Sequence, residues 1–258
     1  MTLIQFCNFN QWIYNIIIVN KPRSISLIFP VYRDKFTVKK VIKKISKILK
    51  KLKIKYEIII IDDFCPEKSG LIALKYSKKN KKIKVYFHKK NMGYGAAIRT
   101  GFKKSKYECV YAVDGDGEFG IALNDLPRIL KKYAFNDLVI TYRYKKRYST
   151  NRIIISWVYN FILRFLFKIN FKDISCGARL VNKKILKKIK LTTNSPFIGA
   201  ELAIKAKYMN YKVDEVGIHS FPSNFRAGSS IVLKNILITI RDIFLLFYKI
   251  YIKNKINS

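Results

Sequence analysis

The run Glu57–Asp63 (EIIIIDD) most constrains the fold, because four consecutive isoleucines lead directly into two aspartates. A strand that is apolar on both faces belongs in a parallel sheet covered by helices on both sides. Further strands are expected at 26–32, 83–88 and 110–113. Between the first two of these four strands, residues 36–52 place apolar side chains on one helix face and lysines on the other. The alternation predicts right-handed βαβ units and a doubly wound sheet.

The rest of the chain is expected to continue this α/β pattern less regularly. The expected elements are helices at 66–79, 96–106, 153–169, 199–209 and 231–252, and strands at 137–142 and 212–218. The helix at 153–169 is apolar on most sides, so it belongs either in the core or on a membrane surface. The helix at 231–252 carries charges, among them Arg241 and Asp242, which argue against a membrane span. They fit an amphipathic helix lying on anionic lipid.

The composition is strongly basic, with 52 Lys and Arg against 16 Asp and Glu in 258 residues. This excess favours an anionic partner: nucleic acid, a membrane face or a phosphorylated substrate. Solvated surface charge is an equally good interpretation, because Lys, Ile and Asn are all abundant. The four cysteines form no CxxC pair, which is typical of reduced thiols in a cytosolic protein. Residues 3–20 lack charge, but Asn and Gln interrupt them too often for a membrane span.

Three acidic side chains follow the expected strand at 110–113: Asp114, Asp116 and Glu118. Alternate residues of an extended segment point the same way, so the three carboxylates would converge and repel one another. A divalent cation relieves this repulsion, and Mg²⁺ and Mn²⁺ prefer hard oxygen ligands that they share with phosphates. The alternative is a surface Asp-Gly turn. Because ligands of doubly wound sheets bind beyond the carboxyl ends of the strands, we expect these acids to join 30–34 and 62–63 in one site.

Five sequence motifs occur in a fixed order along residues 24–230. They are Pro30-Val31-Tyr32-Arg33-Asp34, Ile61-Asp62-Asp63, the turn Asn91–Ala97, Asp114–Glu118 and Asp173–Arg179. Together they resemble the family 2 glycosyltransferases of the GT-A fold, and most closely the polyprenyl-phosphate sugar transferases such as dolichyl-phosphate mannose synthase. The chain departs from the family pattern at Phe64-Cys65, where relatives carry Gly-Ser, and at Glu118, where they carry Gln.

The resemblance implies an inverting transfer of a sugar from a nucleotide-diphosphate sugar to a polyprenyl (dolichyl or undecaprenyl) phosphate. It implies contacts with the nucleotide sugar from Pro30, Tyr32, Asp34, Asp63, Asn91, Gly93 and Asp114. It implies Mg²⁺ or Mn²⁺ held by Asp114, Asp116 and Glu118. It implies an acceptor-phosphate site built from Arg143, Arg152, Ser156, Arg179 and Arg226. Within these sets, the residues expected to carry catalysis are Asp116, Arg143 and Arg152.

The resemblance also implies where the protein works and how its domains divide. We expect an N-terminal extension (1–23), a GT-A domain (24–230) and a C-terminal amphipathic helix with a basic tail (231–258). The expected place is the cytoplasmic face of a membrane, in the synthesis of cell-envelope glycans. Many relatives carry transmembrane helices after the catalytic domain, so a separate membrane partner is a further expectation.

A phosphate acceptor removes the need for a catalytic base, because the second pKa of a phosphate monoester is about 6. We therefore assign no catalytic role to His88 or His219 and expect no essential base. Three alternatives stay open. A glycosyltransferase of the same fold could act on a sugar hydroxyl, which would require a carboxylate base. A basic nucleic-acid-binding protein is a second alternative, although no recognition motif of that class is present. A non-catalytic relative is the third.

Overall fold

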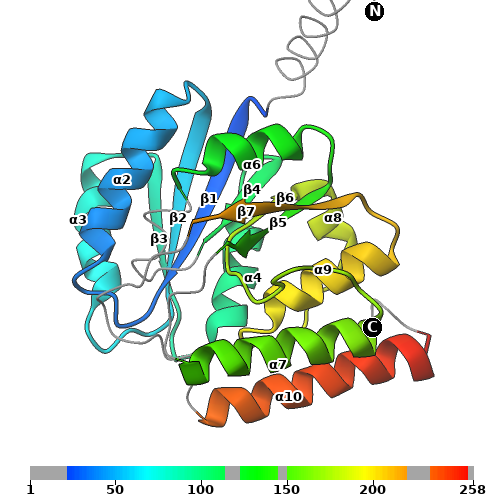
Figure 1. Cartoon of the computed structure of the whole chain (residues 1–258). Coiled ribbons are helices and arrows are strands. Elements are labelled where there is room, and N and C mark those ends of the chain that lie inside the picture. Colours follow the sequence, from blue (N-terminus) through cyan, green and yellow to red (C-terminus); the bar gives the residue numbers. More distant parts are fainter. Residues whose placement is uncertain (1–21, 114–122, 145–149, 220–232, 255–258) are drawn as a thin grey trace, which may run out of the picture.

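The structure, a computed structural model, describes residues 22–113, 123–144, 150–219 and 233–254 (Figure 1). Its centre is a seven-stranded sheet in the order β3-β2-β1-β4-β6-β5-β7. The strands are β1 (Ser24–Val31), β2 (Lys55–Asp62), β3 (Ile83–Phe87), β4 (Cys109–Ala112), β5 (Leu138–Arg143), β6 (Arg179–Asn182) and β7 (Val213–Ile218). Among these strands β6 alone runs antiparallel to its neighbours. The other six strands therefore present their carboxyl ends along one edge of the sheet.

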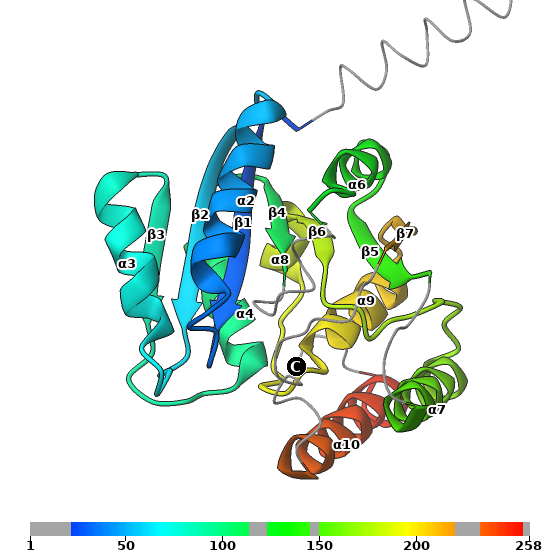
Figure 2. The ribbon, with the colours of Figure 1, turned by 60° about the vertical axis from the view of Figure 1, so that its left-hand side comes forward.

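Helices cover both faces of the sheet. They are α2 (Val38–Lys51), α3 (Ser69–Lys79), α4 (Tyr94–Lys104), α6 (Leu126–Tyr133), α7 (Thr150–Phe167), α8 (Lys183–Lys188), α9 (Ile198–Tyr208) and α10 (Leu233–Phe247), which continues as the π-helix η2 (Tyr248–Ile252). Helices α2, α3 and α6 pack on one face, and α4, α8 and α9 pack on the other. Figures 1 and 2 show α7 and α10 side by side beyond the carboxyl ends of the strands.

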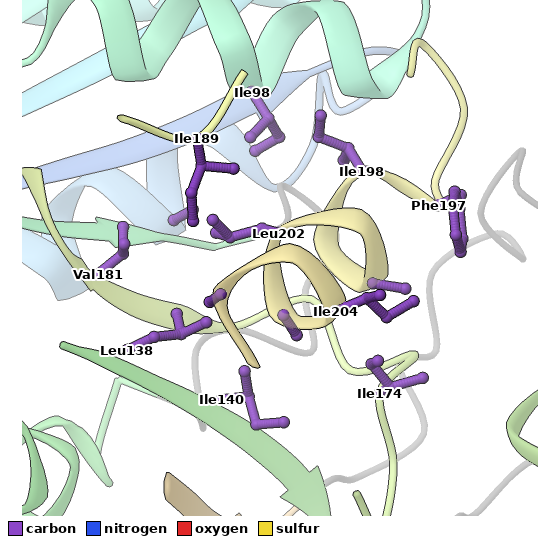
Figure 3. Close-up of a cluster of buried hydrophobic side chains, with 14 of the residues drawn as sticks. Ile98, Leu138, Ile140, Ile174, Val181, Ile189, Phe197, Ile198, Leu202 and Ile204 are labelled. Atoms are coloured by element: carbon purple, nitrogen blue, oxygen red, sulfur yellow. The ribbon is translucent and has the colours of Figure 1, made fainter. Parts of the chain in front are cut away.

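The central strands bury alternate side chains in two separate cores, because successive residues of a strand point to opposite faces. In β1, Leu27 and Phe29 enter one core while Ile28 enters the other, and all three are 0% exposed. The second core surrounds α9 and is drawn in Figure 3, where Leu202 and Ile204 project from the helix among side chains of the sheet. Burial of each such side chain stabilises the fold by about 1.5–3 kcal/mol. This double covering explains the unbroken isoleucine run of β2.

The doubly wound, mixed α/β fold is confirmed, and the expected elements match the observed ones to within a few residues at most ends. The largest shifts, of three residues, are at the starts of α3 and α7, which begin at Ser69 rather than Pro66 and at Thr150 rather than Ile153. The expected helix at 231–252 is α10 followed by the π-helical turn. Three elements were not expected: α6, α8 and the reversed strand β6. In the part of the chain that is described, no helix combines the length and apolar character needed to cross a membrane.

Candidate active site

The carboxyl ends of β1, β2 and β4 meet at one edge of the sheet, as expected. Val31 of β1 pairs with Asp62 of β2, and Ile28 pairs with Ala112 of β4. Val113, which follows β4, donates its N–H to the carbonyl of Ile28 at 3.0 Å, so the pairing with β1 continues to the last described residue before Asp114.

Four predicted site residues lie outside the described ranges: Asp114, Asp116, Glu118 and Arg226. Their predicted roles therefore stay predictions. Among the residues that are described, no group of three His, Cys, Asp or Glu side chains could hold a metal ion.

The loops that follow β1 and β2 are bonded to each other. The Asp34 carboxylate accepts the N–H of Tyr32 at 2.8 Å, and the Asp34 N–H donates to the Ser69 hydroxyl at 3.0 Å. The Arg33 N–H donates to the Cys65 sulfur at 3.1 Å. Tyr32 and Asp34, both predicted nucleotide contacts, therefore belong to a loop that is braced by its neighbour. Pro30, the third contact predicted on this strand, is buried within β1.

The buried carboxylate of Asp62 stabilises the loop that follows β2. Its two carboxylate oxygens accept the N–H groups of Cys65 at 2.7 Å and Gly70 at 2.6 Å. A Cβ atom at Gly70 would stand 2.3 Å from Asp62 Oδ2, so only glycine allows this close approach. The shape of the loop therefore depends on Asp62, which was placed at the site from the sequence without being assigned an individual contact.

Asp63 fastens the glycine turn 91–97 to the end of β2. Its Oδ1 lies 2.7 Å from His88 Nδ1 and accepts the Met92 N–H at 2.9 Å, while Oδ2 accepts the Gly93 N–H at 2.8 Å. Asp63 is 3% exposed. His88 Nε2 in turn lies 2.9 Å from the Thr100 hydroxyl on α4. His88 thus links Asp63 to α4, and the predicted nucleotide contact Asp63 is already bonded to protein groups.

The glycine turn packs against the backbone of residues 193–195. Gly93 has φ +91°, and a Cβ atom there would stand 2.7 Å from the Asn194 carbonyl oxygen. Gly95 donates its N–H to the same oxygen at 2.8 Å. Arg99 of α4 also donates to the Thr193 carbonyl and to the Asn194 side chain. The turn can therefore lie this close to residues 193–195 only because glycine occupies both positions.

A buried ion pair on α9 fixes residues 190–195 from the other side. Glu201 and Lys205 are both 0% exposed and lie 3.0 Å apart. The Glu201 carboxylate also accepts the N–H and hydroxyl groups of Thr192 and Thr193. Burial alone would raise the pKa of Glu201, but the charge of Lys205 and these hydrogen bonds outweigh it, so the pKa lies below its usual value. Glu201 therefore acts as a charged anchor.

The predicted acceptor residues Arg143 and Ser156 come together around Asp173. Arg143, at the end of β5, donates from Nε to Asp173 Oδ2 at 2.7 Å and from Nη2 to Asp173 Oδ1 at 3.1 Å. Nη2 also donates to the Ser175 hydroxyl at 2.7 Å. The hydroxyls of Ser175 and Ser156 are 3.4 Å apart. Guanidinium and hydroxyl donors gathered in this way suit an anion such as a phosphate.

Asn160 of α7 ties this cluster to the helix. Its side-chain carbonyl accepts the Ile174 N–H at 2.9 Å, and its amide donates to the Ser156 carbonyl at 2.7 Å and to Asp173 at 3.3 Å. Asn160 is 3% exposed. Sequence reasoning gave no role to Asn160 or Asp173, although both stood within family motifs. The available signal was a polar residue expected to be buried, since such groups are almost always hydrogen-bonded.

Comparison with known proteins decides the family. Residues 26–190 match the family described as glycosyl transferase family 2. The chain belongs to glycosyl transferase family 2. As a member it is a glycosyltransferase, which confirms the expected enzyme class.

Individual relatives agree with this assignment. The family 2 chain is 23% identical over 220 residues to a dolichyl-phosphate beta-glucosyltransferase of Trichomonas vaginalis, covering 78% of this chain and 67% of that protein. It is 25% identical over 214 residues to a dolichyl-phosphate beta-glucosyltransferase of Dictyostelium discoideum, covering 76% and 65%. The chain therefore spans about two thirds of the length of these two relatives.

A solved structure supports the fold. Glucosyl-3-phosphoglycerate synthase from Mycobacterium tuberculosis, in complex with Mn²⁺, uridine diphosphate and phosphoglyceric acid, superposes with a TM-score of 0.69 at 15% identity. The match covers 91% of the family 2 chain and 81% of that chain. The expected GT-A fold is confirmed.

Two more residues predicted to bind the acceptor phosphate, Arg152 and Arg179, lie in the described part of this glycosyltransferase. Arg152 is half-buried and stands four residues before Ser156, which puts the two on one face of α7. Arg179 is 6% exposed, and its guanidinium donates to the carbonyl of Ile174 at 2.6 Å. The structure thus gives Arg179 a part in holding the 174–177 loop, and its predicted phosphate contact stays a prediction.

Helices α7 and α10 turn an apolar surface to the outside. On α7, Ser156, Asn160, Leu163 and Phe167 form the inward stripe, whereas Trp157 is 60% exposed. On the outer side, Trp157 stacks on Phe161 with ring centroids 5.6 Å apart. We name this surface the α7–α10 apolar face and define it by Ile154, Trp157, Phe161, Phe165, Leu237, Ile240 and Phe244, all of which are exposed.

Proposed function

We propose that this glycosyltransferase moves a sugar, with inversion, from a nucleotide-diphosphate sugar to a polyprenyl phosphate at a membrane surface. The names of the relatives from Trichomonas vaginalis and Dictyostelium discoideum support a lipid-phosphate acceptor. The Mn²⁺ and uridine diphosphate bound by the Mycobacterium tuberculosis enzyme support a nucleotide donor and a divalent cation.

One observation carries the proposal: the Arg143–Ser156 cluster lies directly behind the α7–α10 apolar face. Ser156 and Trp157 are neighbours on α7, yet one faces the cluster and the other faces outward. A polyprenyl phosphate needs this combination, because its phosphate requires cationic donors while its chain stays in the lipid. A neutral sugar hydroxyl requires neither. The exposed tryptophan and phenylalanines, together with the formal charge of +36, favour an anionic lipid layer as the occupant of the face.

The donor side also fits the proposal. Asp114, Asp116 and Glu118 supply oxygen ligands of the kind that Mg²⁺ and Mn²⁺ prefer, and β4 leads into them at the same edge as the β1 and β2 loops. A bound cation would offset the charge that collects on the leaving diphosphate. Arg143 and Arg152 would hold the acceptor phosphate against the repulsion of that diphosphate.

The buried acids of the described edge support transfer without a catalytic base. Asp62 and Asp63 are bonded to the loops they brace, and Asp173 is paired with Arg143. Since a phosphate acceptor is already largely dianionic at pH 7, it needs no such base. To act as the base for a sugar-hydroxyl acceptor, any of these three acids would first have to be released from its partners.

The test is transfer of radiolabelled sugar to lipid by the full-length protein with Mn²⁺. UDP-, GDP-, CDP- and dTDP-sugars would be offered with polyprenyl phosphate, with the free polyprenol and with a neutral oligosaccharide. We expect label in the polyprenyl phosphate alone, with loss of at least about tenfold in Arg143→Ala. Arg128→Ala is the matched control, because Arg128 pairs with Asp125 but is 51% exposed on α6. Transfer to the oligosaccharide instead of the lipid phosphate would overturn the proposal.

A further inference from the structure

The direction in which a bound nucleotide must extend follows from the topology. In the sequence, the acids proposed to bind the cation follow β4 directly, and the proposed acceptor cluster lies on the β5 side, at Arg143. Strand β1 and then β2 lie on the other side of β4. Adjacent strands are about 4.8 Å apart, so the β2 end stands about 10 Å from β4. A nucleoside whose diphosphate sits after β4 therefore reaches over β1 to the end of β2.

The residue that stands at the β2 end is unusual. Phe64 is 60% exposed, although its neighbours Asp63 and Cys65 are 3% and 9% exposed. Its φ is +57°, in the left-handed region that side chains other than glycine, asparagine and aspartate rarely adopt. The fold therefore holds an exposed aromatic ring on a strained backbone. Glycine at this position would avoid both the exposure of an apolar ring and the strain of a positive φ.

A second left-handed residue lies in the neighbouring loop. Arg33, in the loop after β1, has φ +61° and an exposed side chain. Its N–H bonds to Cys65, the residue that follows Phe64, at 3.1 Å. The Arg33 guanidinium lies over the ring of Tyr32, with its Cζ 5.5 Å from the ring centroid. The exposed ring of Phe64 belongs to the neighbouring loop, which is bonded to this one. Strained residues that cluster at a ligand edge point to binding, because the rest of the fold has to hold them in place.

We propose that Phe64 is the platform on which the nucleobase of the donor stacks, with the Arg33 guanidinium beside it. This inference rests on the proposed function, because it presumes a nucleotide donor. Stacking on Phe64 does not depend on Asp63, whose carboxylate is bonded to His88 and to the glycine turn. Every base has a π-face, and aromatic and guanidinium groups both stack on it.

Calorimetric titration of the full-length protein separates a stacking role from a structural one. UDP, GDP and inorganic pyrophosphate, each with Mn²⁺, would be titrated into the wild type, Phe64→Gly, Phe64→Tyr and Phe135→Gly. Pyrophosphate has no base, and Phe135 is a 51% exposed phenylalanine after α6, on another part of the surface. Phe64→Gly should raise the Kd of the nucleotide about fivefold or more and leave the Kd of pyrophosphate unchanged. Phe64→Tyr should bind like the wild type, as should Phe135→Gly.

A thermal unfolding measurement completes the test. Glycine relieves the positive φ, so Phe64→Gly should unfold no lower than the wild type while binding nucleotide more weakly. An unchanged nucleotide Kd in Phe64→Gly would overturn the stacking role, as would an equal loss of pyrophosphate binding. Failure of the wild type to bind any nucleotide would reject the proposed function itself, which is a different outcome.

Discussion

Arg143 and Asp173 form a two-point ion pair in which the carboxylate receives both Nε and Nη2 of the guanidinium, at 2.7 and 3.1 Å. Their side chains are 11% and 3% exposed. Two bonds fix both the position and the plane of the guanidinium, which a single bond cannot do. Asp173 is therefore the residue that aims Arg143, the cation proposed to meet the acceptor phosphate.

Asp173→Asn should lower kcat for transfer to polyprenyl phosphate by about tenfold or more, because an amide cannot receive both guanidinium N–H groups. The Kd of the nucleotide should not change, since Asp173 lies on the acceptor side of β4. Steady-state kinetics and nucleotide titration, both below the unfolding temperature of the variant, measure the two quantities. Asp214→Asn is the control, because it breaks a more exposed ion pair. The side chains of Asp214 and Lys132 in that pair are 36% and 52% exposed. An equal loss of kcat in Asp173→Asn and Asp214→Asn would contradict the role of Asp173.

The double variant Phe161→Glu with Phe165→Glu should bind anionic lipid vesicles at least about tenfold more weakly. It removes two large apolar contacts, each worth about 1.5–3 kcal/mol when fully buried, and adds two negative charges. Flotation with phosphatidylglycerol vesicles measures the binding. The control is Phe135→Glu, which makes the same substitution at a phenylalanine outside the α7–α10 apolar face. If the double variant floats as well as the wild type, the lipid surface does not cover this face.

Glu201→Gln should lower the free energy of unfolding by about 3–5 kcal/mol, because it leaves Lys205 charged and buried without a counter-ion. For a chain of this size the unfolding temperature should fall by roughly 6–20 °C. Thermal denaturation followed by circular dichroism measures the change. Breaking the exposed pair with Lys132→Met should cost at most about 1 kcal/mol. A similar small cost for Glu201→Gln would show that the buried pair does not anchor residues 190–195.

The free energy of unfolding should fall as the pH drops below about 4.3, the usual pKa of glutamate in unfolded chains. Burial of Glu57 would raise its pKa, but hydrogen bonds from Lys84, Ser26 and Lys106 lower it, and the pKa of Glu201 is also lowered. Groups with a lowered pKa in the folded state stabilise it above the unfolded pKa and lose that effect as they are protonated. Urea unfolding at pH 7, 5, 4 and 3 measures the loss.

Glu57→Gln supplies the control for the pH dependence. The amide does not titrate, so this variant should be less stable than the wild type at pH 7 and should lose less stability between pH 5 and 3. The curves of unfolding free energy against pH for the variant and the wild type should therefore approach each other at low pH. A wild-type protein that is as stable at pH 3 as at pH 7 would contradict the assignment of lowered pKa values.

Local sequence was sufficient for the parallel half of the sheet. Strands β1 and β2 are buried on both faces, so 27–31 and 58–61 are apolar without interruption and the pattern is visible in a single window. The position of Asp62 and Asp63 at the carboxyl edge follows from that pattern alone. Strand β6 was missed because four residues carry too little periodicity, and its reversed direction depends on pairing with β4 and β5.

The sequence by itself determined the α/β fold, the edge at which the site lies and the residue types offered there to an anion and a cation. Only the tertiary structure decided how those residues are used. Asp63 meets His88 and Gly93, and Arg143 meets Asp173, across separations of 25 to 30 residues. Such bonds depend on how strands and loops far apart in the chain are brought together, and no local preference of the chain contains that information.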